Sequence, residues 1–317
     1  MNESKLVFSV AFAFLDYDIS PNVASKDRIA TYMRSLCVSV ASVRRFYPAQ
    51  SIRVFTNISI DEQFMSVLTR LNVENIIIPF THIAPKGMLD RFQSALFLLD
   101  AIRNLEFDAC HVLLDPDIVL VRELPFEIEK SESVWALPLA YGLDEIVNGM
   151  SLRQQINWQA SQGVLSPHGI HFGGEFQVIP GSQVTTLAAR INEAWQYSLN
   201  DFASEKQHLY TEDQYLNYAY NFVEVSDASK IVARIWTAFN FRSIPANFRE
   251  LNLWHLPAEK DDGFHRLFKL IEQPNSWFWN STPDSFRLQM AIEMYLSQSN
   301  FLFKLKKICR KLPTKYL

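Results

Sequence analysis

The sequence lacks the features that mark several large classes of protein. Its 317 residues include only three cysteines, Cys37, Cys110 and Cys309, which are odd in number and widely separated. This spacing suggests neither a disulfide framework nor a cysteine-based metal site, and it favours a reducing compartment. The formal net charge is −4, so there is no basic excess that would indicate nucleic acid as the main partner.

Long apolar runs and repeated segments are also missing. The first apolar run, Leu6–Leu15, is too short to cross a bilayer, and it has neither the basic flank nor the cleavage site of a signal peptide. No repeat, low-complexity tract or Pro/Ser-rich linker divides the chain, and no Gly-x-x-x-x-Gly-Lys phosphate loop occurs. We therefore expect a cytoplasmic globular protein.

The chain does contain an alternation of strand and helix patterns. Short apolar, β-branched runs predict strands over residues 5–15, 51–56, 74–79 and 111–121. Apolar residues at helical spacing predict helices over residues 27–47, 61–71 and 87–105. This alternation predicts an α/β fold with a mostly parallel central sheet, flanked by helices and suited to nucleotide binding.

The second half has a different pattern. We expect strands over residues 134–139, 171–180, 231–236 and 251–255, and helices over residues 182–199 and 211–220. The stretch with Gly142, Gly149 and Gly163 is predicted to be rich in loops, and aromatic residues precede a helix within residues 272–297. We expect a catalytic domain over residues 1–265 and a C-terminal helical extension over residues 266–317.

An acidic pair follows the fourth predicted strand. Pro116 ends that strand between Asp115 and Asp117, because proline removes a ladder donor. Carboxylates at the carboxyl end of a buried strand lie where α/β sheets bind ligands. Mg²⁺ and Mn²⁺ commonly combine such carboxylates with phosphate oxygens of a substrate. Asp-Pro-Asp is also ordinary turn chemistry, so the tripeptide alone leaves both interpretations open.

Four segments, in order over roughly residues 5–260, resemble those of the GT-A glycosyltransferases, particularly the retaining family-8-like enzymes that use nucleotide sugars. Leu113–Val119 looks like the Asp-x-Asp strand of that family, and the strand with Gly173 and Gly174 resembles the segment that approaches the donor sugar. Thr211–Asn217 is similar to the family's Asp-Gln-x-x-Leu-Asn helix start. Trp254–Lys260 resembles its His-x-x-Gly-x-x-Lys segment, although the glycine is absent and the lysine lies one residue nearer the histidine.

The resemblance implies a metal-dependent glycosyltransferase. Such an enzyme would move a sugar from a nucleotide-diphosphate sugar, expected to be a UDP-sugar, to a saccharide or lipid-linked acceptor in surface glycan synthesis. The implied ligands of Mn²⁺ (or Mg²⁺) are Asp115, Asp117 and His255, and the cation would neutralise the departing diphosphate. Because His255 follows Trp254, it could instead be a histidine that only packs in the core.

The resemblance also implies roles around the metal. The residues expected to bind the nucleotide sugar are Tyr17, Asp18, Lys86, Arg91, Asp115, Gly173, Gly174 and Lys260, and those expected to be catalytic are Asp213, Gln214 and Glu175. Asp213 or Gln214 would hydrogen-bond sugar hydroxyls or stabilise an oxocarbenium-like centre. Lys86 and Arg91 could instead be ordinary solvated charges on the surface. Glu212 and Asp213 could instead be acids that are favoured at a helix N-terminus by the helix dipole.

Residues 301–317 form a basic stretch with apolar residues at helical spacing and six lysines and arginines. Such a helix suits the anionic inner face of a membrane, or packing on its own domain. Two other functions stay open. One is a sugar nucleotidyltransferase, although residues 14–26 lack the Gly-rich basic loop expected of it. The other is an inactive GT-A-like carbohydrate-binding or scaffold protein.

Overall fold

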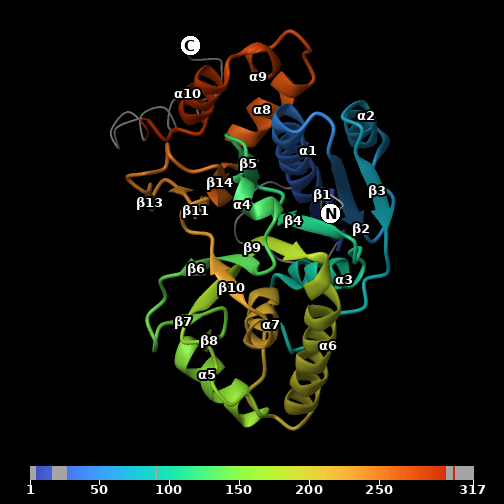
Figure 1. Ribbon diagram of the computed structural model, residues 1–317, viewed down its shortest axis with the longest axis vertical. Coiled ribbons are helices and arrows are strands. Elements are labelled where there is room, and N and C mark those ends of the chain that lie inside the picture. The colour runs from blue at the N-terminus through green and yellow to red at the C-terminus, as the bar shows by residue number, and fades with distance from the viewer. Residues whose placement is uncertain (1–4, 16–26, 90, 298–302, 304–317) are drawn as a thin grey trace.

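The computed structural model describes residues 5–15, 27–89, 91–297 and 303. A seven-stranded sheet lies at the centre of this described part (Figure 1). In spatial order its strands are β10 (Val225–Asp227), β6 (Val134–Leu139), β9 (His171–Pro180), β4 (Ala109–Leu114), β1 (Lys5–Phe12), β2 (Ser51–Thr56) and β3 (Glu74–Ile77). All neighbours are parallel except those of β9, which runs antiparallel to β4 and β6. The predicted mostly parallel α/β sheet is confirmed.

Helices cover both faces of the sheet (Figure 1). The hydrophobic core of one face includes residues of α1 (Arg28–Phe46), α2 (Glu62–Arg70), α4 (Phe126–Glu129), α8 (Gly263–Ile271), α9 (Trp277–Asn280) and α10 (Pro283–Glu293). The core of the other face includes residues of α3 (Phe97–Arg103), α5 (Leu152–Ser161), α6 (Gly181–Ala203) and α7 (Glu212–Ala219). Each face of the sheet therefore has its own buried apolar layer.

A smaller sheet extends from the carboxyl end of β4. It consists of β11 (Val232–Arg234), β14 (Leu253–His255) and β5 (Ile118–Leu120). Two hairpins, β7 (Ile146–Val147) with β8 (Met150–Ser151) and β12 (Trp236–Thr237) with β13 (Arg242–Ser243), lie outside both sheets. The 3₁₀ turns are η1 (Gln93–Leu96), η2 (Tyr220–Phe222) and η3 (Pro257–Glu259).

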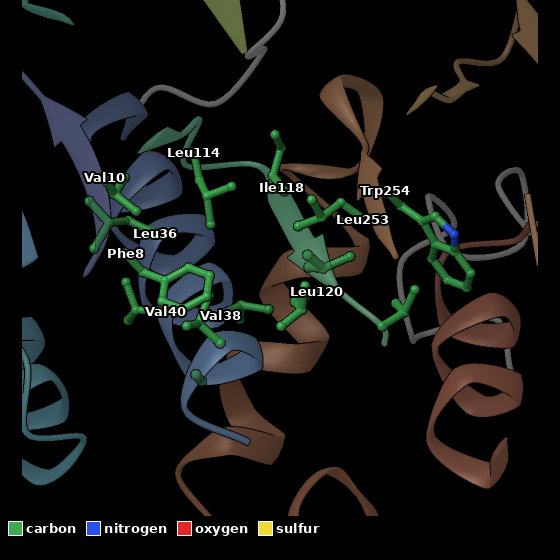
Figure 2. Close-up of a cluster of buried hydrophobic side chains, with 14 of the residues drawn as sticks. Phe8, Val10, Leu36, Val38, Val40, Leu114, Ile118, Leu120, Leu253 and Trp254 are labelled. Atoms are coloured by element: carbon green, nitrogen blue, oxygen red, sulfur yellow. The ribbon is translucent and has the colours of Figure 1, made fainter. Parts of the chain in front are cut away.

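Helix α1 joins the two sheets. Asp27 caps its N-terminus by accepting a hydrogen bond from the Ala30 N–H at 3.2 Å. Near its other end, the Ser42 hydroxyl accepts a hydrogen bond from the Leu120 N–H in β5 at 2.9 Å. Figure 2 shows apolar side chains of β1, α1, β4, β5 and β14 in one buried cluster. This shared core holds the ends of β4, β5 and β14 in fixed positions relative to one another.

The helix predicted over residues 87–105 is wrong in its first half. The α-helix covers only Phe97–Arg103 and is preceded by the 3₁₀ turn Gln93–Leu96. Gly87 and Phe92 have positive φ angles of 88° and 62°, a left-handed conformation that a right-handed helix cannot contain. The sequence keeps a helix-like spacing of apolar residues across this break, because the irregular segment before the helix also packs onto the core.

The stretch predicted to be loop-rich contains a helix, α5. Ser151 and Gln154 form a capping box at its start: the Ser151 hydroxyl accepts from the Gln154 N–H, and the Gln154 side chain accepts from the Ser151 N–H. The Ser-x-x-Gln spacing is visible in the sequence, and it identifies this helix better than the glycines around it.

No helix in the described ranges is long and apolar enough to cross a membrane.

The C-terminal region adds α8, α9 and α10 to the face of the sheet that carries α1 (Figure 1). The expected division after residue 265 would fall inside α8, which packs against α1. Of the basic stretch 301–317, only Phe303 is described; the Arg242 guanidinium lies 5.3 Å from the centre of its ring. The other residues of that stretch lie outside the described residues, so the basic helix stays a prediction.

Gly181 should be required for packing α6 onto the sheet. A Cβ at this position would overlap the carbonyl oxygen of Phe107 and would lie 2.7 Å from that of Ala109. Because both obstacles are backbone atoms, we expect Gly181→Ala to lower the free energy of unfolding by about 2 kcal/mol or more. Urea denaturation measures this, with Gly169→Ala as the control, since a Cβ there meets nothing within 4 Å. Equal stability of the two variants would refute the close approach.

Candidate active site

The two carboxylates of the Asp-Pro-Asp turn lie at the carboxyl end of β4. The Asp115 N–H donates to the carbonyl of Glu175 in β9 at 2.9 Å, and the Ile118 N–H donates to the carbonyl of Asp115 at 3.1 Å. This turn points the Asp117 side chain into the protein, where it is 2% exposed, while that of Asp115 is 43% exposed. The turn therefore presents one buried and one accessible carboxylate at the same edge of the sheet.

His255 is brought to these carboxylates by the smaller sheet. Strand β14 runs antiparallel to β5 and places His255 opposite Ile118, the residue after Asp117. Its Nε2 atom lies 3.3 Å from Asp117 Oδ2 and 3.8 Å from Asp115 Oδ2. Ligand atoms of these three residues all lie within 4.8 Å of one another. Two carboxylates and an imidazole form a donor set that suits Mn²⁺ or Mg²⁺ better than a soft metal.

The orientation of the His255 ring fits metal binding. Its buried Nδ1 atom has no hydrogen bond of good geometry and faces Glu175 Oε1 at 3.4 Å. Histidines that bind a metal through one ring nitrogen commonly direct the other toward a carboxylate, which fixes the tautomer. With Nδ1 directed at Glu175, Nε2 is left to face the two aspartates. The residues present therefore fit a divalent cation.

Lys260 completes the charge balance around Asp117. It follows β14 through the turn η3, and its ammonium group forms a buried ion pair with Asp117 Oδ2. Although burial alone would raise the pKa of Asp117, the charges of Lys260 and His255 hold it well below its usual range. Burial alone would lower the pKa of His255, but Asp117 and Glu175 raise it to about 9. For Asp115, partial desolvation in the cavity wall and the neighbouring charge of Asp117 raise the pKa to about 7.

A second ion pair, between the half-buried Arg234 and the buried Glu175, lies beside the first. Arg234 is in register with His255 on the neighbouring strand β11. Its Nε and Nη2 atoms donate to the two Glu175 oxygens at 3.0 and 2.9 Å, and its Nη1 donates to the Tyr141 hydroxyl at 3.0 Å. Burial would raise the pKa of Glu175, but Arg234 and His255 lower it to about 2. Sequence reasoning missed Arg234 and Tyr141, which lie outside any recognisable motif.

A cavity of about 340 Å³ opens over these groups. Its walls come from the carboxyl ends of β1 and β4, from the segment around η1, from β9 and from the start of α7. The residues that line it include Tyr32, Asp115, Glu175, Glu212, Arg234 and Lys260. The cavity lies at the edge of the sheet where α/β proteins bind their ligands.

The start of α7 contributes two carboxylates to the cavity wall. Asp213 is fixed by the Thr211 hydroxyl and by His171 Nε2, which lies 3.0 Å from Asp213 Oδ2. Burial would raise the pKa of Asp213, but His171 and Thr211 hold it below its usual value. Glu212 also lines the cavity, and burial together with Asp213 raises its pKa well above the usual range.

Gln214, although expected to be catalytic, does not line the cavity. Its Oε1 atom accepts a hydrogen bond from the Tyr210 N–H at 2.7 Å, and its Nε2 donates to the carbonyl of Asn148 at 3.2 Å. Asn148 belongs to the turn of the β7–β8 hairpin and lines the cavity together with Val147. Gln214 therefore holds a wall of the cavity in place rather than facing its interior.

Of the other residues expected to bind the nucleotide sugar, some line the cavity and others do not. Gly174 lines the cavity, whereas Gly173 is buried beneath the Glu175 side chain. Lys86 and Arg91 are exposed and do not line the cavity; the Arg91 guanidinium lies 5.7 Å from the centre of the Phe92 ring. Tyr17 and Asp18 lie outside the described residues. For Lys86, Arg91, Tyr17 and Asp18, donor binding stays a prediction.

No protein-family model matches the chain, and no curated protein matches it. Among solved structures, the chain is similar to the galactosyltransferase LgtC in complex with donor and acceptor sugar analogs, with 11% identity, a TM-score of 0.48 and 98% of each chain covered. It is also similar to the bifunctional glycosyltransferase WbbM, with 12% identity and a TM-score of 0.48 over 80% of this chain and 46% of that one. An active-site mutant of LgtC gives 12% identity, a TM-score of 0.46 and coverage of 87% and 99%. At this degree of similarity, function has to be inferred from the site itself.

The acidic cluster should bind Mn²⁺. Because Asp117 is the buried carboxylate of the three-residue set, we expect Asp117→Asn to weaken Mn²⁺ binding by about 100-fold or more. Electron paramagnetic resonance of free Mn²⁺ in a titration measures the affinity. Asp144→Asn removes the same charge at an exposed position outside the cavity and serves as the control. Equal affinities of the two variants would rule out Asp117 as a ligand.

The Glu175–Arg234 pair should make stability depend on pH in the metal-free protein. An acid whose pKa is lower in the folded chain stabilises the fold above its usual value of 4.5, and this contribution disappears as the pH falls toward 2. Glu175→Gln leaves the half-buried Arg234 without its counter-charge, so we expect a loss of about 2 kcal/mol at pH 7.

Urea denaturation of wild type and variant between pH 3 and pH 7, with a chelator present, measures this dependence. The stability difference should be largest at pH 7 and should shrink at pH 3. A difference that is independent of pH would show that Glu175 is not held ionised by Arg234.

Proposed function

We propose that the protein is a metal-dependent glycosyltransferase of the GT-A type, which transfers a sugar from a nucleotide-diphosphate sugar to a saccharide or lipid-linked acceptor. The observation that carries this proposal is the cluster of Asp115, Asp117 and His255 at the carboxyl end of β4, opening into the 340 Å³ cavity beside Lys260. An accessible carboxylate, a buried carboxylate and an imidazole would hold a divalent cation, which would neutralise charge on a bound diphosphate. UDP is the nucleotide that we expect, and Mn²⁺ or Mg²⁺ the cation.

The metal would supply electrostatic stabilisation to the diphosphate as the bond to the sugar breaks. Lys260 supports this chemistry from the protein side. Its ammonium group pairs with Asp117 in the metal-free chain, and we expect it to pair with a phosphate oxygen when the carboxylate binds a cation. The donor would then meet two sources of positive charge at one end of the cavity.

The carboxylates at the other end would serve the sugar. Asp213 is oriented by His171 and Thr211, and we propose that it faces the anomeric region and stabilises positive charge there, with retention of configuration. Glu175 has both oxygens bound by Arg234 and faces His255, which favours an orienting role over a catalytic one. Gln214 is bound to backbone groups and would act by shaping the cavity wall.

We extend the proposal to the acceptor and to the place in the cell where the enzyme would act. We propose a catalytic domain over residues 1–265, with the remaining residues forming a C-terminal extension. Its basic stretch, residues 301–317, would bring the enzyme to the anionic inner face of a membrane, where each basic residue contributes about 1 kcal/mol. A lipid-linked saccharide acceptor in surface glycan synthesis would be met there.

A panel of UDP-, GDP- and ADP-sugars tests the proposal. We expect binding and slow hydrolysis of one donor class in Mn²⁺ and none with a chelator, because the diphosphate is held through the cation. Asp117→Asn should lower kcat/KM for hydrolysis by about 100- to 1,000-fold, and Asp144→Asn should leave it unchanged. Calorimetry reports binding, and release of the nucleoside diphosphate reports turnover.

Two outcomes would contradict the proposal. Failure of every donor to bind, with or without the cation, would exclude a nucleotide-sugar enzyme. Metal-dependent binding without turnover of any donor, in the presence and absence of simple saccharide acceptors, would favour a carbohydrate-binding protein.

A further inference from the structure

The hairpin of β12 and β13 connects the candidate active site with the surface of the protein. At the base of the hairpin, the Ile235 N–H donates to the carbonyl of His255 at 2.8 Å, and the Thr237 hydroxyl donates to Glu259 Oε1 at 2.5 Å. Trp236 lies between these two anchors and lines the cavity. The hairpin is therefore fixed to the segment that supplies the site with its histidine and its lysine.

The turn of this hairpin exposes two phenylalanine side chains. The Phe241 N–H donates to the carbonyl of Ala238 at 3.3 Å and closes the turn. Phe239 is 44% exposed and Phe241 is 57% exposed, and β13 lies at the periphery of the molecule (Figure 1). Turns at a protein surface are usually built from polar residues and glycine. Two exposed aromatic rings at one turn therefore indicate a surface that contacts something other than water.

The start of the basic C-terminal stretch is held against the same hairpin. Phe303 is buried, its ring centre lies 5.6 Å from that of Tyr295, and the guanidinium of Arg242 in β13 lies 5.3 Å from it. Arg242 Nη2 also donates to the carbonyl of Tyr295 at 2.7 Å. Residues 304–311 follow directly, with five lysines and arginines and no acid. Because consecutive Cα atoms are about 3.8 Å apart, the first four of these residues lie within about 15 Å of Phe303.

The sequence of the hairpin and its return loop carries no negative charge. Residues 235–249 include Arg242 and Arg249 but no aspartate or glutamate. Segments that bind at a membrane surface combine aromatic side chains, which enter the boundary between headgroups and acyl chains, with lysines and arginines that attract anionic headgroups. Contact with another protein does not require acids to be missing, so the charge pattern favours a lipid surface.

We propose that the tip of the β12–β13 hairpin, residues 239–241, inserts into the headgroup region of an anionic membrane beside the basic stretch; this rests on the proposed function, which brings that stretch to such a membrane. The basic residues supply the attraction, and Phe239 and Phe241 supply the apolar contact. Phe239 is three residues beyond Trp236, a distance of about 10 Å in an extended strand. Insertion would therefore hold the cavity close to the lipid surface, where a lipid-linked acceptor is found.

Flotation of the full chain with lipid vesicles tests the proposal. We expect wild type to bind vesicles of phosphatidylglycerol and phosphatidylcholine. The double variant Phe239→Ser/Phe241→Ser should bind them about 10-fold more weakly or less, because two apolar side chains no longer leave water. The control, Phe107→Ser/Phe126→Ser, removes two exposed phenylalanines near the amino end of β4, opposite the cavity, and should leave binding unchanged. Circular dichroism of each variant verifies folding.

A fluorophore at the tip of the hairpin reports insertion directly. Asn240→Cys is labelled with the environment-sensitive dye NBD in a chain that also carries Cys309→Ser; Cys37 and Cys110 are buried. Because the dye leaves water on insertion, we expect its emission to shift to shorter wavelength on the anionic vesicles. The same dye on Asp108→Cys, an exposed position before β4, should show no shift.

Several results would overturn the inference. Wild type that does not bind the anionic vesicles, a hairpin variant that binds as tightly as wild type, or an unchanged emission at position 240 would each exclude the contact. Ultracentrifugation without vesicles that shows a wild-type dimer and a monomeric hairpin variant would assign the phenylalanines to a second copy of the chain instead. Metal-dependent donor hydrolysis is measured without vesicles, so the proposed function and the hairpin contact are refuted by different results.

Discussion

The candidate site depends on the neutralisation of buried carboxylates. An ionised carboxyl group inside a protein costs several kcal/mol unless a counter-charge and hydrogen bonds replace its water. Asp117 has Lys260 and His255 as partners, and Glu175 has Arg234. Because these cations come from residues 234–260, the acidic turn after β4 can be buried only when this later part of the chain is folded against it.

The smaller sheet supplies this counter-charge through its register. Strand β14 lies between β5 and β11, so Ile118, His255 and Arg234 are lined up across three strands. Ile118 follows Asp117 of the acidic turn, while His255 and Arg234 face Glu175 of β9 in the larger sheet. The hydrogen bond from Leu120 to Ser42 and the core shared with α1 fix β5 in the same frame. The large sheet thus provides the acids and the small sheet most of their partners.

Sequence reasoning found the regular parts of this arrangement. Strands β2, β6 and β9 were predicted with the bounds that the structure has, because each contains a short segment of apolar residues with strong strand propensity. The acidic turn and His255 were found because their residue types and their order match one kind of chemistry. The break at Phe92 was missed because a left-handed residue in an apolar segment does not change the spacing of apolar side chains.

Arg234 was missed for a different reason, and the direction of the Gln214 side chain could not be predicted for the same reason. An arginine in a short strand has no local signal, and only the pairing of β11 with β14 reveals its partner Glu175. Gln214 lies in a recognisable helix start, but the direction of its side chain depends on the Asn148 and Tyr210 backbone. Contacts between segments distant in the sequence decide both roles.

The order in which the site is assembled follows from where its parts lie along the chain. Strands β1, β2, β3, β4, β6 and β9 and both aspartates are synthesised before residue 181, whereas His255 and Lys260 emerge from the ribosome more than 130 residues after Asp117. A nascent chain that stopped at residue 250 would contain every strand of the large sheet but would leave Asp117 without either cation. Neutralised burial of the acidic turn therefore has to wait until translation has passed Lys260, so completion of the core around β5 reports that the segment with His255 and Lys260 is present.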